Sequence, residues 1–225
     1  MSVTAASLIL IAIIGYLWGS IASGYWMGIL LRGKGFDVRN YGSHKTGATN
    51  VRRSLGNGPA LVVLLIDLSK GIGPALIATL VPFFFNAGWG PSVAGLAALI
   101  GHCFPVFIGF RGGRGVSTGA GAILVISPFT FLLSLAATIG TIAISRFVSL
   151  GSIVGALTSI TCGIVFYFVG QASPTFFAHV SLAQMVYLVA GPALVILLHY
   201  DNIGRLLTGK ERKLGQKEAI APSNS

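Results

Sequence analysis

The chain has 225 residues, of which 54% are hydrophobic and only 9% are charged, and its mean hydropathy is +0.84. A soluble domain of this size could not keep such a composition in solution, so the composition excludes a soluble globular protein and indicates an integral membrane protein. Lys and Arg number 15 against five Asp and Glu, a balance that favours membrane lipids and other phosphates as partners and gives no indication of nucleic acid.

Apolar runs predict the membrane-spanning helices in chain order. Four runs reach the roughly 20 residues that a bilayer requires, and they cover residues 7–31, 58–85, 89–110 and 176–200. A further run fills the interval between Arg146 and Gly170. The first run is too long for the core of a secretion signal, and no Lys or Arg precedes it, so we expect a retained helix.

The basic residues are clustered, which predicts the orientation of the helices. They lie mainly in residues 32–53, at Arg111 and Arg114, at Arg146, and in residues 205–217. Loops rich in Lys and Arg face the cytoplasm according to the positive-inside rule. The connections between these clusters, such as residues 86–88 and 170–173, contain no basic residue and are therefore expected outside.

Residues 115–146 fit either one long helix or two shorter helices. A single crossing would place Arg146 and the basic C-terminal tail outside, whereas crossings at residues 116–126 and 129–145 keep both inside, with Pro128 as the break. The predicted fold is therefore an all-α bundle of seven transmembrane helices, with the N-terminus outside and the C-terminus in the cytoplasm. Residues 1–215 form its single domain.

Some features of the predicted bundle concern its packing and its ends. The pairs Gly15/Gly19 and Ser20/Gly24 on the first helix are small residues four apart, a pattern that permits close contact between helices. Residues 216–225 are polar and are expected to form a disordered tail.

Three ionisable groups within the helices have two open interpretations. Asp67 and Lys70 are three residues apart near the middle of the second helix, where charges are costly and usually paired. A structural ion pair is the favoured interpretation, and a part in a functional site is the other. His199, three residues before Asn202 on the expected last helix, is either a structural histidine or a member of the site.

Three polar stretches lie on the predicted cytoplasmic side, and each combines basic residues with small hydroxyl or amide residues. They are NYGSHKTGATNVRRSLG (40–56), GHCFPVFIGFRGGRGVSTGAG (101–121) and HYDNIGRLLTGKERKLG (199–215). Attachment to anionic headgroups would explain the basic residues of the flanking loops, but it would not require the neighbouring Gly, Asn, Ser and Thr. The three stretches therefore predict one anion-binding site.

The second stretch has the composition of a phosphate-binding loop. Gly112, Gly113 and Gly115 permit positive φ and a close approach of backbone N–H groups to a ligand, and the loop then opens a helix. Arg111 and Arg114 add donors that match phosphate oxygens. The loop is not a Walker A motif, because no Gly-Lys-Ser/Thr stands at the required spacing.

The same stretches resemble the three motifs of the bacterial acyl-phosphate:glycerol-3-phosphate acyltransferases of the PlsY type. GSHKTGATNVRRSLG resembles GSGNxGATNxxR, GHCFPVFIGFRGGRGVST resembles GHxFPxFxxFKGGKGxAT, and HYDNIGRLLTGKE resembles HxxNIxRLxxGxE. The resemblance covers nearly the whole chain, with matching order and spacing. It implies transfer of an acyl group from acyl phosphate to the 1-hydroxyl of glycerol 3-phosphate, at the cytoplasmic side of a bacterial inner membrane.

The resemblance and the side-chain chemistry together select the candidate site residues. The expected catalytic residues are Ser43, Arg53, Arg114, His199 and Asn202. The expected substrate-binding residues are Thr49, Asn50, Arg111, Gly112, Gly113, Gly115, Ser117, Thr118, Arg205 and Glu211. Acyl phosphate is an activated anhydride, so positioning and charge neutralisation can carry much of the catalysis. We expect no cofactor and no metal.

Four of the departures from the motifs concern the first loop and the two motif lysines. His44 and Lys45 replace the usual Gly-Asn pair, and Arg111 and Arg114 replace two lysines. An acyltransferase with an altered acceptor, a non-catalytic binder of phosphorylated metabolites and a membrane transporter remain the alternatives. A transporter predicts an inverted repeat and ionisable residues along a path through the bilayer, and the sequence contains no clear repeat.

Overall fold

The computed structural model describes residues 3–173 and 178–216 of the chain. Within these residues all regular secondary structure is helical, as predicted. The α-helices and the short 3-10 helices (η) are, in order, α1 (Val3–Gly19), α2 (Ser23–Arg32), η1 (Val38–Asn40), α3 (Ala48–Leu55), α4 (Asn57–Leu80), α5 (Pro82–Phe85), η2 (Asn86–Gly88), α6 (Trp89–Cys103), η3 (Val106–Ile108), α7 (Val116–Ile126), α8 (Pro128–Ser145), α9 (Val148–Ala172), α10 (Leu182–Leu197) and α11 (Tyr200–Leu207).

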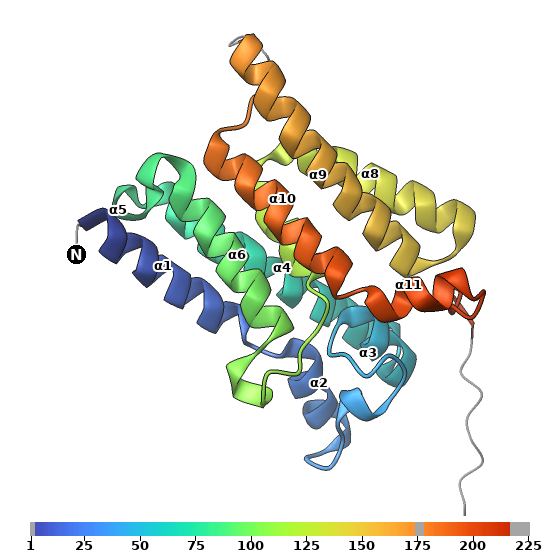
Figure 1. The fold of residues 1–225 in the computed structure, drawn as a ribbon. Helices are drawn as coiled ribbons and strands as arrows, with labels where there is room; N and C mark the ends of the chain where they lie inside the picture. The colour runs from blue at the N-terminus through green and yellow to red at the C-terminus, as the bar shows by residue number, and fades with distance from the viewer. Residues whose placement is uncertain (1–2, 174–177, 217–225) are drawn as a thin grey trace, which may run out of the picture.

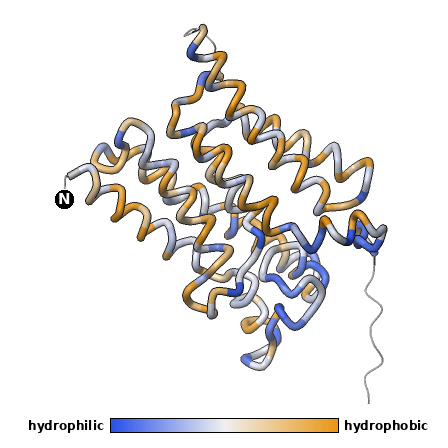
Figure 2. Tube along the Cα trace, in the orientation of Figure 1, coloured by the Kyte–Doolittle hydropathy of each residue, from blue (hydrophilic) through white to orange (hydrophobic). Residues whose placement is uncertain are grey.

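The long helices form a bundle whose polar segments gather at one end. Figure 1 shows α1, α6, α10 and α9 side by side, with α8 against α9 and with α2, α3 and α11 at the same end of the bundle. Figure 2 shows that the hydrophilic residues are concentrated around α3 and α11, whereas the long helices are mainly hydrophobic. All three polar stretches reach this end.

Glycines allow the helices of the bundle to approach one another closely. A Cβ added to Gly15 on α1 would lie 2.5 Å from the carbonyl oxygen of Ala94 on α6, and one added to Gly19 would collide with the carbonyl of Ala98. The predicted packing role of the Gly15/Gly19 pair is therefore confirmed. Gly71 on α4 meets α7 in the same way, at the carbonyl of Thr118.

The lengths of the helices support a multi-pass membrane protein. Five segments of the described chain are long and apolar enough to cross a bilayer, and α10 with α11 makes a sixth if this bent pair is one span. The predicted break before Pro128 is confirmed, since α7 ends at Ile126 and α8 begins at Pro128. At 11 residues α7 is only about 16 Å long, shorter than the hydrocarbon core.

The first predicted helix is interrupted. α1 ends at Gly19 and α2 begins at Ser23, and Ser20 between them is fully buried, with its hydroxyl donating a hydrogen bond to the carbonyl of Tyr16. Gly24 lies on α2, where a Cβ would collide with the carbonyl of Thr46 in the following loop. Ser20 and Gly24 are therefore both buried at close contacts, but the interruption separates them, so the prediction that they are a pair on one helix is wrong.

Three other predicted helices are shorter than their apolar runs. In the run over residues 89–110, α6 ends at Cys103. α4 ends at Leu80 because Val81, which precedes Pro82, has extended backbone angles (φ −95°, ψ 109°). The predicted last helix, residues 176–200, begins in residues that lie outside the described part of the chain. Its described part, α10, stops at Leu197, and α11 is bent by 59° from it. Of the predicted tail, residues 217–225 lie outside the described residues.

Candidate active site

A cavity of about 660 Å³ opens at the polar end of the bundle, and all three polar stretches line it. The first stretch contributes the loop before α3 and part of α3, the second contributes the start of α7, and the third contributes α11 and the segment after it. α8 and α9 close the remaining side. Of the candidate residues, the cavity is lined by Ser43, Thr49, Asn50, Arg53, Arg114, Gly115, Ser117, His199, Asn202, Arg205 and Glu211.

Asn50 organises the first loop. Its side chain is buried, its Nδ2 donates hydrogen bonds to the carbonyls of Val38, Tyr41 and Lys45 (2.8–3.0 Å), and its Oδ1 accepts one from the backbone N–H of Ser43 (2.8 Å). Both polar atoms of the Asn50 side-chain amide therefore already have hydrogen-bond partners within the loop. Asn50 therefore positions Ser43 at the cavity, and the expectation that its amide binds substrate is not supported by this geometry.

The glycine loop differs from the predicted phosphate cradle. The N–H groups of Gly112 and Gly113 donate to the carbonyls of Cys103 and His102 at the end of α6, each at 3.1 Å. These two amides are therefore not available to a ligand, and of the three loop glycines only Gly115 has positive φ, at 81°. Gly112 and Gly113 are required because a Cβ at either would collide with His102.

The backbone N–H groups in the first turn of α7 are available to a ligand, unlike those of Gly112 and Gly113. Gly115 precedes the helix as its N-cap, and Val116 and Ser117 in the first turn line the cavity. The first N–H groups of a helix have no partner within it and carry partial positive charge, which is a favourable environment for an anion. The part of the predicted anion site that lies at the helix start therefore has a geometric basis, whereas the part at Gly112 and Gly113 does not.

Arg53, Arg114 and Arg205 line the same cavity as the first turn of α7. The pKa of Arg114 is lowered from its ordinary value, because burial disfavours the charge and because Arg205 and Arg53 add positive potential nearby. Its Nε is buried and has no hydrogen-bond partner among the described residues. The positive charges of the arginines and the unpartnered Nε of Arg114 indicate that the cavity binds an anion.

Glu211 holds the third stretch in place. Its carboxylate accepts hydrogen bonds from Ser149 Oγ, Asn202 Nδ2 and Arg205 Nε, all at 2.8 Å. A carboxylate would repel a phosphate, so Glu211 positions Asn202 and Arg205, and the predicted direct contact with substrate does not fit this arrangement. Asn202 Oδ1 remains buried without a partner in the described residues and is free to accept a hydrogen bond from a ligand.

The ionisation of Glu211 makes a testable contribution to stability. Burial alone would raise the pKa of Glu211, but the hydrogen bonds from Asn202, Ser149 and Arg205 outweigh it and lower the pKa below the ordinary value of 4.5. A group with a lowered native pKa stabilises the fold above its unfolded pKa, and this contribution is lost as the pH falls through the native pKa. We therefore expect Glu211→Gln to reduce Tm near neutral pH, with a gap from the wild type that narrows as the pH falls below 4.5. A gap of constant size over this range would contradict an ionised Glu211 in the cluster.

His199 and Thr118 have different positions relative to the cavity. His199 is buried between α10 and α11, and its Nδ1 lies 2.7 Å from the carbonyl of Val195. Because a carbonyl only accepts, Nδ1 carries the proton and Nε2 is the available nitrogen. Thr118 is fully buried and donates to the backbone carbonyl of Asp67 at 2.9 Å, so it joins α7 to α4 and does not line the cavity.

The predicted pairing of Asp67 and Lys70 is confirmed. Lys70 Nζ lies 2.5 Å from Asp67 Oδ1, both side chains are at most 2% exposed, and the hydroxyl of Ser23 donates to the same oxygen at 2.5 Å. His102 Nδ1 lies 3.6 Å from that oxygen. Asp67 and His102 also line the cavity, so this buried network forms its floor.

Sequence reasoning missed Ser149 and Ser152 on α9. Both line the cavity, and Ser149 is a partner of Glu211. The available signal was their spacing of three residues, which places both hydroxyls on one face of an otherwise apolar helix. Arg111, Gly112 and Gly113 line a second, smaller cavity instead of this one.

Comparison with known proteins relates this chain to a family. The profile of the glycerol-3-phosphate acyltransferase family matches residues 9–209. The chain is 40% identical over 221 residues to glycerol-3-phosphate acyltransferase 3 of Dehalococcoides mccartyi, covering 94% of this chain and 98% of that one. It is 39% identical over 212 residues to the glycerol-3-phosphate acyltransferase of Thermoanaerobacter sp. strain X514, with the same coverage.

Solved structures agree with this relationship. The crystal structure of PlsY (YgiH), an integral membrane glycerol 3-phosphate acyltransferase in its glycerol 3-phosphate form, superposes with a TM-score of 0.77 at 36% identity, over 93% of this chain and 96% of that one. Its lysophosphatidic acid form superposes with a TM-score of 0.74. The chain therefore belongs to the glycerol-3-phosphate acyltransferase family of integral membrane proteins.

Proposed function

We propose that this protein transfers a fatty acyl group from acyl phosphate to the 1-hydroxyl of glycerol 3-phosphate, giving lysophosphatidic acid and inorganic phosphate. The observation that carries this proposal is that Arg53, Arg114 and Arg205 line one cavity together with the first turn of α7. Both substrates are phosphates, so both need cationic groups there. The family membership and the PlsY structure with glycerol 3-phosphate support the acceptor.

The site residues then have complementary roles. Arg53, Arg114 and the first turn of α7 hold the two phosphates, and Ser43 and Thr49 donate further hydrogen bonds. Asn202 Oδ1 accepts from a hydroxyl of the acceptor. Arg205 adds positive charge, and Glu211 fixes Arg205 and Asn202 in position. The acyl chain extends from the cavity between the helices.

The reaction requires little covalent chemistry from the protein. The 1-hydroxyl oxygen of the acceptor forms a bond to the acyl carbon, and the bond between that carbon and the phosphate oxygen breaks. The cationic groups stabilise the charge that develops on the leaving phosphate. The hydroxyl proton passes to the acceptor's own phosphate, and Nε2 of His199 is the alternative base.

The proposal includes an orientation in the membrane. Adding α10 with α11 and the short α7 to the five long spans makes seven crossings, with the N-terminus outside and the C-terminus in the cytoplasm. The basic residues around α3 and α11 support a cytoplasmic position for the cavity, since basic loops remain on that side. For a bacterial protein this membrane is the cytoplasmic membrane.

The test uses the purified protein in lipid with palmitoyl phosphate as donor. We expect phosphate release that depends on glycerol 3-phosphate, with one lysophosphatidic acid formed for each phosphate, and no product from palmitoyl-CoA. Turnover with palmitoyl-CoA alone would contradict the proposed donor. A folded protein that binds both compounds without turnover would instead be a non-catalytic binder, and one that moves glycerol 3-phosphate across the vesicle membrane would be a transporter.

A further inference from the structure

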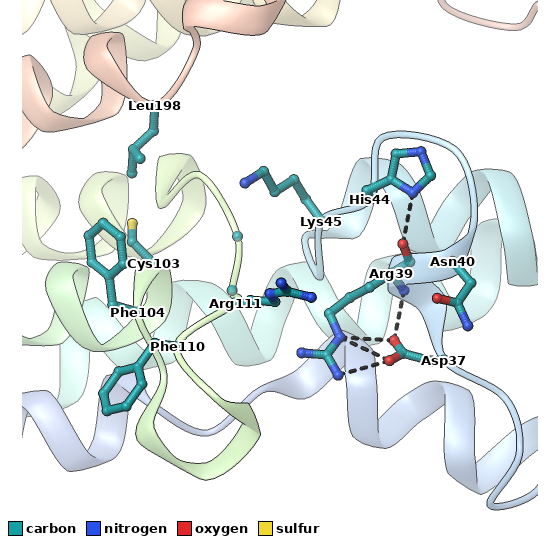
Figure 3. A pocket seen from close by; sticks show the side chains of 12 residues that line it. Asp37, Arg39, Asn40, His44, Lys45, Cys103, Phe104, Phe110, Arg111 and Leu198 are labelled. Atoms are coloured by element: carbon teal, nitrogen blue, oxygen red, sulfur yellow. Dashed lines mark hydrogen bonds and ion pairs between the residues drawn. The ribbon is translucent and has the colours of Figure 1, made fainter.

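The segment that carries Arg114 lies between two cavities. Arg114 lines the first cavity, whereas Gly112 and Gly113 line the second, which has a volume of about 450 Å³. Figure 3 shows the second cavity, with Arg111 extending from this segment toward Arg39. Because there is open space on both sides, the position of the segment depends on the few contacts that it makes with the helices around it.

His102, near the end of α6, holds the segment before Arg114. Its carbonyl accepts the hydrogen bond from the N–H of Gly113 at 3.1 Å, and its imidazole fills the space beside Gly113, where a Cβ would collide with Nε2. The imidazole is itself held in place, because its Nδ1 lies 3.6 Å from Oδ1 of Asp67 and the side chain is only 5% exposed. A carboxylate only accepts, so Nδ1 carries the proton that faces Asp67.

Asp67 also holds the chain after Arg114. Its backbone carbonyl accepts a hydrogen bond from the hydroxyl of Thr118, in the first turn of α7, at 2.9 Å. Its carboxylate is fixed in turn by the salt bridge with Lys70. Arg114 therefore lies between two points, Gly113 and Thr118, that are both connected to one buried residue of α4.

We propose that His102 is a positioning residue, which, with its ring held by Asp67, keeps the guanidinium of Arg114 in the orientation that the reaction requires. The inference rests on the proposed acyl transfer, since that reaction defines the role of Arg114. It requires no contact between His102 and a substrate. A misplacement of about 1 Å can slow a reaction about 10²-fold, so His102→Ala should lower kcat/KM at least about tenfold.

A double-mutant cycle distinguishes positioning from general destabilisation. Lysophosphatidic acid formation from palmitoyl phosphate and glycerol 3-phosphate is measured per folded protein for the wild type, His102→Ala, Arg114→Ala and the double variant. If His102 acts through Arg114, His102→Ala should change kcat/KM less than about twofold in the Arg114→Ala protein. The same fold-loss in both backgrounds, with an active wild type, would overturn the positioning role. A wild type without acyl transfer would overturn the proposed function and this role with it.

Gln184→Ala is the matched control, because it removes a contact at the other end of α7. Nε2 of Gln184 donates to the carbonyl of Ile126 at 2.7 Å. The variant should lower Tm, and its effect on kcat/KM should be the same with and without Arg114→Ala. If its effect also disappeared in the Arg114→Ala protein, the cycle would be reporting the stability of α7, and the positioning role of His102 would be overturned.

Two conservative variants test which nitrogen of His102 matters. His102 lines the first cavity, so a direct action of Nε2 on a substrate is the competing explanation. Asn has a nitrogen as many bonds from Cα as Nδ1, and Gln has one as many bonds away as Nε2. His102→Asn keeps the donor toward Asp67 and should retain more activity than His102→Gln, a comparison that remains possible if His102→Ala does not fold. Higher activity of His102→Gln would overturn the positioning role.

Discussion

Replacing Arg114 with alanine is expected to lower kcat/KM for acyl transfer by about 10² to 10³-fold, since removal of one preorganised donor to developing negative charge has an effect of this size. The guanidinium lies where Arg53 and Arg205 also add positive charge, and its buried Nε has no partner in the described residues. Both observations indicate that the guanidinium of Arg114 is available to bind the substrate. Lysophosphatidic acid formation from palmitoyl phosphate measures the effect.

Controls for Arg114→Ala separate catalysis from folding. The variant should keep its Tm, because removing one of three neighbouring cations relieves repulsion. Arg114→Lys keeps the charge but loses the planar pair of donors, so it should retain much more activity than the alanine variant. Normal turnover by Arg114→Ala would remove this residue from the site.

Replacing Asp67 with alanine is expected to destabilise the protein by about 3–5 kcal/mol, because it leaves the ammonium group of Lys70 buried and unpaired. Among the described residues, Lys70 would keep only the hydroxyl of Ser23, 3.2 Å away, as a hydrogen-bond partner. Thermal unfolding in detergent measures the change. Because Asp67 also lines the cavity floor, activity should fall together with stability.

Two variants test whether the buried charge is the cause. Asp67→Ala combined with Lys70→Met removes both charges and should recover most of the lost stability. Asp37→Ala breaks the Arg39 pair, whose side chains are 24% and 21% exposed, and should cost at most about 1 kcal/mol. A double variant no more stable than Asp67→Ala would show that the loss comes from packing and not from the unpaired ammonium.

The helices were largely predictable because their determinants are local. The apolar runs correspond to long helices, and Pro128 separates α7 from α8 as expected. The interruptions at Ser20 and after Leu197 had no proline or charge to mark them. They arise where the chain turns to pack α2 against α3 and α4 and to bring α11 to the cavity, which depends on contacts between distant segments.

The site was predictable as a set of residues but not as a set of contacts. The motifs located the cationic residues, and the structure gathers Arg53, Arg114 and Arg205 in one place. Composition could not show which polar groups are already used within the protein. The backbone amides of Gly112 and Gly113 donate hydrogen bonds to α6. The glycine pattern alone does not reveal these bonds.

The most direct test of the account asks which bond forms in the reaction. The protein is supplied with palmitoyl phosphate and with glycerol 3-phosphate that carries ¹⁸O in its 1-hydroxyl group, and the products are analysed by mass spectrometry. Acyl transfer predicts lysophosphatidic acid with ¹⁸O in the ester and unlabelled inorganic phosphate. Release of free palmitate with ¹⁸O in a new phosphate ester of glycerol would mean phosphoryl transfer and would contradict the proposed function.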